Sequence, residues 1–149
     1  GSVLRVSNLT WTKQGLRLPY RQEVVERLYR ACSARNAALS LVAEDAGGRL
    51  HAAALIVYDS RCAYYLLGGA DHDLRTSGAH SLLLWEAMRR LANVSATFDL
   101  EGSYVPGIER FFRGFGATRS NLLIAERQTP TFRAANSLRL ALLRARPRQ

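Results

Sequence analysis

The sequence lacks any long hydrophobic run. Its longest apolar segments, such as residues 52–58, are far shorter than the roughly 20 uncharged apolar residues that a membrane-spanning helix requires. The chain also has no basic segment followed by an apolar one at its start, the pattern that is typical of a secretory signal. We therefore expect no membrane span and a location in the cytoplasm.

Cysteine and histidine are scarce as well. The two cysteines, Cys32 and Cys62, are too few for a disulfide framework or a zinc site, which favours two buried or half-buried thiols in a reducing compartment. The three histidines, His51, His72 and His80, do not have the spacing of metal ligands. The sequence therefore predicts no metal site.

Lysine is almost absent. Lys13 is the only lysine among 21 basic residues, so arginine supplies nearly all of the positive charge behind a formal net charge of +9. Such a skew is as typical of codon bias in a GC-rich genome as of function. The tail after residue 132 has five arginines and no acid, and so supplies about five of the nine charges. The remaining excess suits a phosphate-bearing cofactor or an anionic partner.

Three common enzyme motifs are missing. The sequence has no Gly-x-Ser-x-Gly elbow, no phosphate-binding Walker loop and no Gly-x-Gly-x-x-Gly that follows a strand. Their absence argues against an α/β-hydrolase, a P-loop NTPase and a Rossmann dehydrogenase.

Hydrophobic periodicity and turn signals divide the chain into helices and strands. We expect helices at residues 19–34, 77–92, 106–115 and 130–145, and strands at 39–43, 50–58, 63–67, 97–100 and 121–125. The first three strands predict an antiparallel meander, and the helix after them predicts a parallel crossover to the next strand. The order predicts an α/β (α+β) fold in which helices flank a mixed, mostly antiparallel sheet.

The length of 149 residues is that of one domain, and no linker or repeat divides it. We expect residues 1–149 to form this single domain. Residues 1–18 are expected to be an extension or the remnant of a longer chain, because Gly1 and Ser2 look like a cloning scar. Residues 130–149 predict an arginine-rich C-terminal helix.

The segment at residues 74–85 is the most informative for function. A strand ends, Arg75 and a small polar stretch follow, and Gly78 with Ala79 opens an amphipathic helix. Free backbone N–H groups and the dipole at a helix start attract anions, and a glycine there lets a diphosphate approach the backbone. The candidate contacts to a cofactor are Arg75, Thr76, Ser77, Gly78, Ala79 and His80. The alternative is an ordinary helix start with Thr76 or Ser77 as its cap.

Two acids, Asp99 and Glu101, form the second candidate site. On a strand they project from the same face, roughly 7 Å apart, and can raise one another's pKa. One of them is then suited to act as a general base toward an amine. The alternative is that one carboxylate caps the turn at residues 102–103 or pairs with an arginine. The pattern leaves both interpretations open for the pair and favours the structural one for either acid alone.

Aromatic residues gather in two places. Tyr64 and Tyr65 are adjacent on an expected strand, so one should lie in the core while the other lines a cleft and offers a hydroxyl. We take Tyr65 as the candidate catalytic residue of the two. A helical stripe at residues 108–115 is best explained as core packing, and Gly116 as the glycine that ends this helix.

Taken together, these segments resemble the GNAT superfamily of acyltransferases, and within it the Fem-type (FemABX-like) and BioF2-like (CelD-like) bacterial enzymes. The similar segments are residues 12–20, with a Gln-Gly pair before a helix, residues 63–69, residues 75–85 and residues 98–116. Members of this branch usually have two tandem domains. This chain is long enough for one and looks like the C-terminal one.

The resemblance implies an acyl-coenzyme A site on a loop with the pattern Arg/Gln-x-x-Gly-x-Gly/Ala. Arg75, Gly78 and Ala79 fit this pattern, but His80 occupies the last small position. Many GNAT enzymes also use a tyrosine as general acid in a Tyr-x-x-x-Gly pattern. Here Phe112 precedes Gly116, and a phenylalanine cannot donate a proton, so that role is empty or has moved.

Three functions follow from these expectations. The first is an N-acyltransferase that uses acetyl-coenzyme A or another acyl-coenzyme A, and no metal, to modify a small-molecule or cell-envelope amine. The second is Fem-type aminoacyl transfer from tRNA to a cell-wall precursor, which the arginine-rich tail favours. The third is a non-catalytic binding module. A homodimer, or a partner domain that is missing here, is a further expectation.

Overall fold

The computed structural model describes residues 20–102 and 105–121, together with residues 123, 127, 129–132 and 136–137. The chain divides into two compact units, Gly1–Thr118 and Arg119–Gln149, and all of the elements below belong to the first. The extension at residues 1–18 lies outside the described residues. So do most of the expected strand at 121–125 and most of the arginine-rich helix at 130–149, of which the described residues 130–132 and 136–137 are helical.

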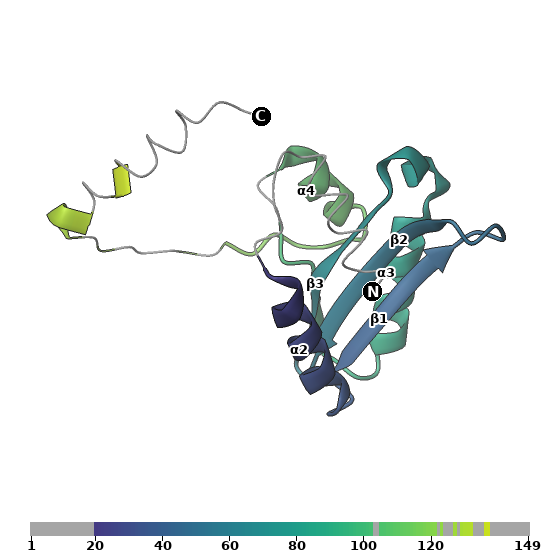
Figure 1. Cartoon of the computed structure of the whole chain (residues 1–149), viewed down its shortest axis with the longest axis horizontal. Coiled ribbons are helices and arrows are strands. Elements are labelled where there is room, and N and C mark those ends of the chain that lie inside the picture. The colour runs from purple at the N-terminus through teal and green to yellow at the C-terminus, as the bar shows by residue number, and fades with distance from the viewer. Residues whose placement is uncertain are drawn as a thin grey trace. The chain divides into compact units, whose positions relative to one another are not determined.

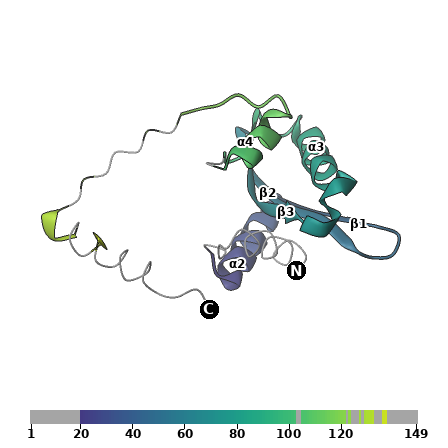
Figure 2. The same cartoon turned by 90° about the horizontal axis from the view of Figure 1, so that it is seen from above.

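The first unit is a mixed sheet between helices (Figures 1 and 2). In chain order the elements are α2 (Gln22–Ser33), β1 (Ala38–Glu44), β2 (Leu50–Tyr58), β3 (Cys62–Ala70), the 3-10 helix η1 (His72–Ser77), α3 (Ala79–Leu91), β4 (Thr97–Asp99) and α4 (Pro106–Arg113). The four strands lie in sequence order, the first three antiparallel and β4 parallel to β3. The expected fold class, meander and crossover helix are therefore confirmed.

The central strand β2 joins two hydrophobic layers. Ala52, Ala54 and Ile56 face α3 and α4, where they pack with Leu84 and other buried residues. Leu55 faces the opposite side and packs with Val25 of α2. Figure 2 shows this arrangement, with α2 on one side of the sheet and α3 and α4 on the other. Because both faces are covered, β2 reads as a continuous apolar run.

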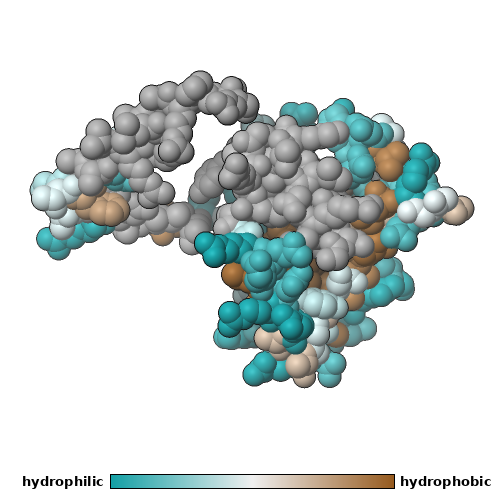
Figure 3. Space-filling view, viewed as in Figure 1, coloured by the Kyte–Doolittle hydropathy of each residue, from teal (hydrophilic) through white to brown (hydrophobic). Residues whose placement is uncertain are grey.

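Figure 3 shows one face of the molecular surface. Over α2 it is mostly hydrophilic, while hydrophobic residues show mainly over the strands (Figure 3). On α3 the buried side chains are those of Leu83, Leu84, Ala87 and Leu91. Trp85, which follows the buried Leu84 in the sequence, is 59% exposed. The leucines of α3 pack against Ala52 and Ala54 of β2.

A β-bulge at Leu66 interrupts the pairing of β3 with β2. Leu55 pairs with Leu67, but the next residue of β2, Ile56, pairs with Tyr65, so Leu66 is an extra residue. A bulge of this kind exchanges the faces on which successive residues lie. Tyr65 therefore joins the core beside α3, whereas Leu67 joins the core beside α2.

The bulge brings the Tyr65 ring over Gly68. A Cβ atom built on Gly68 would lie 2.6 Å from the Tyr65 hydroxyl and 2.6 Å from the carbonyl oxygen of Ala53. We expect Gly68→Ala to lower the free energy of unfolding by about 1–3 kcal/mol, the usual cost of overpacking. Gly107→Ala is the matched control. Its Cβ would meet nothing within 4 Å, so it should be neutral or stabilising, since alanine favours a helix. Urea unfolding measures both, and equal midpoints would contradict the prediction.

The starts of two expected helices differ in the structure. The first helix begins at Gln22 with Arg21 as its N-cap, three residues after Pro19, which lies outside the described residues. The second does not begin at residue 77. The preceding residues form η1, and α3 begins at Ala79. The polar segment expected to be a loop is therefore mostly one short, tight helix.

Candidate active site

The junction between η1 and α3 is a left-handed turn at Gly78. This glycine has φ = +71°, a conformation that residues with a side chain rarely adopt. The N-cap of α3 is Gly78 and not Thr76 or Ser77, so the alternative of a side-chain cap by one of these two is wrong. The Ser77 hydroxyl does accept the Ala79 N–H, at 3.4 Å.

The turn exposes the start of α3 to an approaching ligand. Within the helix, the first N–H to reach a carbonyl is that of Leu82, which donates to Gly78 at 3.0 Å. The N–H groups of His80 and Ser81 therefore point out of the helix start, where the helix dipole favours a negative charge. A Cβ atom built on Gly78 meets nothing within 4 Å. The backbone here is open to close contact with a diphosphate.

The candidate donor loop, residues 75–80, is partly occupied by its own contacts. Residues 75–78 are exposed, and Ala79 and His80 are half-buried. The Arg75 guanidinium lies 3.3 Å from the Nε2 of His72, so this exposed charge stands beside the loop. The His80 side chain turns away from the loop and toward β3.

An aromatic cluster formed by Tyr65, His80, Phe111 and Phe112 lies behind the donor loop. The Tyr65 hydroxyl is hydrogen-bonded to the Nε2 of His80 at 3.0 Å. The His80 ring stacks on Phe111 with centroids 5.0 Å apart, and the Tyr65 ring meets the edge of Phe112 at 6.2 Å. Burial lowers the pKa of His80 to about 4 and raises the pKa of Tyr65. Both side chains are therefore neutral near pH 7.

The two tyrosines lie on opposite faces of β3, as predicted. Tyr65 is the core residue, 9% exposed, and Tyr64 is 38% exposed. The candidate catalytic tyrosine does not line an open cleft, because its hydroxyl is bound to His80. It lies against Phe112, the residue found where the family pattern has a tyrosine. The stripe that includes Phe112 packs into the core, which confirms that prediction.

Asp99 and Glu101 lie in a turn and do not share one face of a strand. β4 ends at Asp99, and Glu101 has φ = +61°. The Asp99 carboxylate accepts the Glu101 N–H at 2.7 Å and thereby holds this turn. The prediction that both acids project from one strand face is therefore wrong, because the strand is too short. Partial burial, followed by the charge of Asp99, raises the pKa of Glu101.

β3 and β4 diverge beside the core tyrosine. The strands pair at Cys62 with Thr97, at Ala63 with Phe98 and at Tyr64 with Asp99. Beyond these pairs β3 continues to Ala70, but β4 does not extend alongside it. A strand edge of this kind can hydrogen-bond an extended ligand through its backbone. The turn at residues 99–101, called the acid turn below, lies beyond one end of this edge, and the donor loop lies beyond the other.

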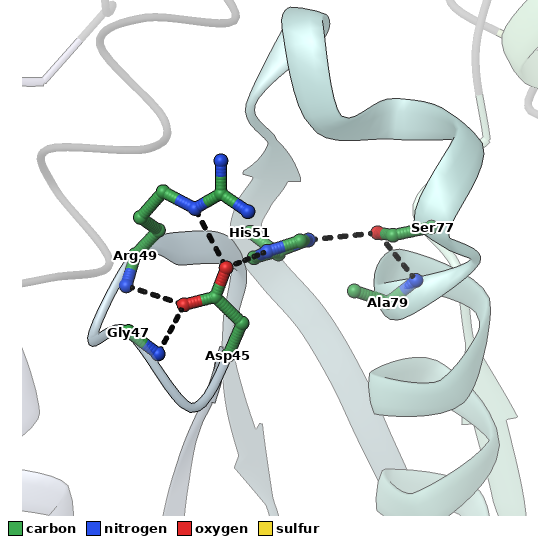
Figure 4. Close-up of polar contacts among 6 residues, drawn as sticks. All are labelled: Asp45, Gly47, Arg49, His51, Ser77 and Ala79. Atoms are coloured by element: carbon green, nitrogen blue, oxygen red, sulfur yellow. Dashed lines mark hydrogen bonds and ion pairs between the residues drawn. The ribbon is translucent and has the colours of Figure 1, made fainter.

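Sequence reasoning missed a chain of polar contacts that reaches the donor loop. In Figure 4 the His51 ring lies between the Asp45 carboxylate and the Ser77 hydroxyl. Asp45 and His51 flank the β1–β2 turn, whereas Ser77 ends η1. The sequence separation of 26 residues between His51 and Ser77 gave no local signal, since only the strand pairing brings them together.

Other features of the described residues do not add a site. No group of three or more potential metal ligands occurs in this part of the chain. None of the described helices is long and apolar enough to cross a membrane. A shallow groove of about 280 Å³ lies at the far end of α3 from the donor loop, lined by residues such as Met88, Leu91 and Phe98.

Comparisons with known proteins agree with this geometry. A family model described as an acetyltransferase (GNAT) domain matches residues 2–113. No curated protein matches the sequence. Glucosamine-6-phosphate N-acetyltransferase from Arabidopsis thaliana has a similar structure, with a TM-score of 0.60 and 11% identity over 85% of this chain and 92% of that one.

Two further solved structures are similar. An acetyltransferase from Trypanosoma brucei aligns with a TM-score of 0.57 and 12% identity, over 82% of this chain and 91% of the other. An aminoglycoside 6'-N-acetyltransferase from Acinetobacter baumannii aligns with a TM-score of 0.56 and 12% identity, over 87% and 94%. At these identities the likeness shows a shared fold.

Proposed function

Because this chain belongs to the GNAT acetyltransferase family, and is therefore an enzyme of that class, we propose that it transfers an acyl group from acyl-coenzyme A to an amine. The amine belongs to a small molecule or to a cell-envelope component. The observation that carries the proposal is the exposed, left-handed Gly78 at the start of α3, flanked by the charge of Arg75.

The residues of the donor loop fit a diphosphate group. The N–H groups of His80 and Ser81 supply donors at the start of α3, and the absence of a side chain at Gly78 leaves the space that close contact requires. Arg75 adds a positive charge at the same place. His80, although larger than the family pattern allows, directs its ring toward Tyr65 and leaves the mouth of the loop to the smaller residues.

The remaining residues take roles around the reacting carbonyl. Acyl-coenzyme A supplies a thioester whose carbonyl carbon accepts the amine and whose thiolate leaves. Backbone N–H groups of β3 between residues 65 and 68 stabilise the oxygen that becomes negative. Glu101 accepts the amine proton, directly or through a water molecule, and its raised pKa makes it a stronger base than an ordinary glutamate.

Calorimetry with acetyl-coenzyme A tests the donor. We expect binding in the micromolar to low millimolar range, followed by acetylation when a panel of amines is added. No heat of binding at millimolar acetyl-coenzyme A would remove the proposal. Release of free thiol, followed with a colorimetric thiol reagent, gives an independent measure of turnover.

His80 favours a second candidate, Fem-type aminoacyl transfer from tRNA. This residue stands where the coenzyme A pattern has a small one, although its ring points away from the loop, toward Tyr65 and Phe111. tRNA binding should weaken steeply with salt, because phosphate contacts release counterions. A chain that binds acetyl-coenzyme A and shows no affinity for tRNA at low salt excludes this candidate.

Asp99 supports the reaction by holding Glu101. Asp99→Ala removes the acceptor for the Glu101 N–H and should release the turn. We expect a loss of about 0.5–1.5 kcal/mol in the free energy of unfolding, the usual net value of one hydrogen bond. Asp99→Asn keeps an acceptor oxygen and should retain more of this stability. Thermal unfolding of the two variants measures the difference, and equal losses would argue against a capping role.

A further inference from the structure

The donor loop is tied to the β1–β2 turn by one histidine. The Nδ1 of His51 lies 3.0 Å from the Ser77 hydroxyl, and its Nε2 lies 3.2 Å from Asp45. The backbone of the same residue accepts the Asp71 N–H at 2.8 Å. Since Asp71 precedes η1 and Ser77 ends it, His51 holds both ends of this short helix.

Asp45 gives the histidine a fixed support. One oxygen of its carboxylate accepts the N–H groups of Gly47 and Arg49, each at 2.9 Å, and the other accepts Arg49 Nε at 2.7 Å (Figure 4). These hydrogen bonds hold the pKa of Asp45 well below its usual range, so the carboxylate stays ionised. An ionised carboxylate only accepts hydrogen bonds. The Nε2 of His51 must therefore carry the proton that points to it.

This tautomer sets the direction of each hydrogen bond in the series from Asp45 through His51 to Ser77. In the tautomer with its proton on Nε2, the His51 ring presents a lone pair at Nδ1, which accepts the Ser77 hydroxyl proton. The Ser77 oxygen then turns a lone pair toward the Ala79 N–H, at 3.4 Å. This series of hydrogen bonds thus ends on the Ala79 N–H, next to the N–H groups of His80 and Ser81 that face an anion, and it fixes Ser77, the residue just before Gly78.

We propose that His51, oriented by Asp45, is a positioning residue that fixes Ser77 and the first turn of α3 for binding the diphosphate of the donor. The proposal rests on the proposed function. His51 is largely buried, with 14% of its side chain exposed, and acts through Ser77 without reaching the reacting atoms. When its side chain is lost, the backbone bond to Asp71 remains. The loop should therefore stay folded while its end loosens.

Two substitutions of His51 separate its two hydrogen bonds. His51→Asn places an acceptor oxygen near the position of Nδ1 and keeps the bond to Ser77. His51→Gln places its amide nitrogen near the position of Nε2 and keeps only the bond to Asp45. We expect His51→Gln to weaken binding of acetyl-coenzyme A about 3- to 10-fold, the worth of one hydrogen bond, and His51→Asn to weaken it less. Melting temperatures should be alike, and kcat should change less than the KM for the donor.

A measurement without acetyl-coenzyme A tests the same idea. Amide exchange of Ala79, His80 and Ser81, followed by NMR, should be faster in His51→Gln than in the wild type, with His51→Asn closer to the wild type. Millimolar inorganic pyrophosphate should shift these amides in the wild type and less in His51→Gln. Unchanged exchange and unchanged pyrophosphate shifts in His51→Gln would overturn the positioning role. Normal pyrophosphate shifts without acetyl-coenzyme A binding would instead remove the proposed function alone.

Discussion

Gly78→Val is expected to weaken acetyl-coenzyme A binding by about 100-fold or more. The added side chain stands where the diphosphate contacts the start of α3, and a loss of one or two charge-assisted hydrogen bonds there accounts for such a factor. The substitution also strains the backbone, because Gly78 has φ = +71° and a branched residue in the left-handed region costs roughly 1–2 kcal/mol. Calorimetric affinity and thermal stability must therefore be measured together.

Gly116→Val is the matched control for this strain. Gly116 has φ = +81°, and its added Cβ would also meet nothing within 4 Å, but it follows α4 and is not part of the donor loop. Both variants should lose similar stability, while only Gly78→Val loses donor affinity. Normal binding of acetyl-coenzyme A by Gly78→Val would refute the diphosphate site.

Glu101→Gln is expected to lower turnover by about 10²- to 10⁴-fold, the usual contribution of a general base. Donor binding should be unchanged, because Glu101 lies at the end of β4 and outside the donor loop. Glutamine keeps the size of the side chain and cannot accept the amine proton. Steady-state rates and calorimetry on the same preparation distinguish a lost base from a lost site. Equal turnover of the variant and the wild type between pH 6 and 9 would remove Glu101 from the mechanism.

The pH profile gives the same residue a second test. Partial burial and the charge of Asp99 raise the pKa of Glu101, so its basic form is lost as the pH falls through a value above that of an ordinary glutamate. The low-pH limb of kcat/KM should lie at this raised value and should be absent in Glu101→Gln. The effect of Glu101 on the free energy of unfolding changes with pH in the opposite direction to its effect on the rate. The stabilising contribution of protonated Glu101 is complete below its ordinary pKa and is lost as the pH rises through the raised one.

The strands and the core were the more predictable parts. The run at residues 50–58 is apolar on both faces, and β2 has these bounds because both faces are buried. The opposite faces of Tyr64 and Tyr65 follow from the two-residue period of a strand, and the burial of Phe112 follows from the helical period around it. These features depend on local pattern, which the sequence displays directly.

The site was less predictable because its geometry depends on backbone states and distant contacts. A glycine before a helix is compatible with either sign of φ, so the left-handed turn at Gly78 could not be deduced. Asp99 and Glu101 would share a face only on a longer strand, and nothing local showed that β4 stops at Asp99. The bond between His51 and Ser77 required the register of the sheet and the course of η1.

The parallel pairing of β4 with β3 also bears on the order in which the molecule assembles. β1, β2 and β3 are joined by short turns, whereas the pair between Cys62 and Thr97 closes a loop that contains all of α3. Closing a long loop costs more chain entropy than closing a hairpin, and β4 gains only three paired residues in return. We expect the meander to form first and β4 to be the last strand to dock and the first to open. In native-state hydrogen exchange, the Thr97 amide, which donates to Arg61, should then exchange sooner than the amides of β2, so the acid turn is lost before the sheet.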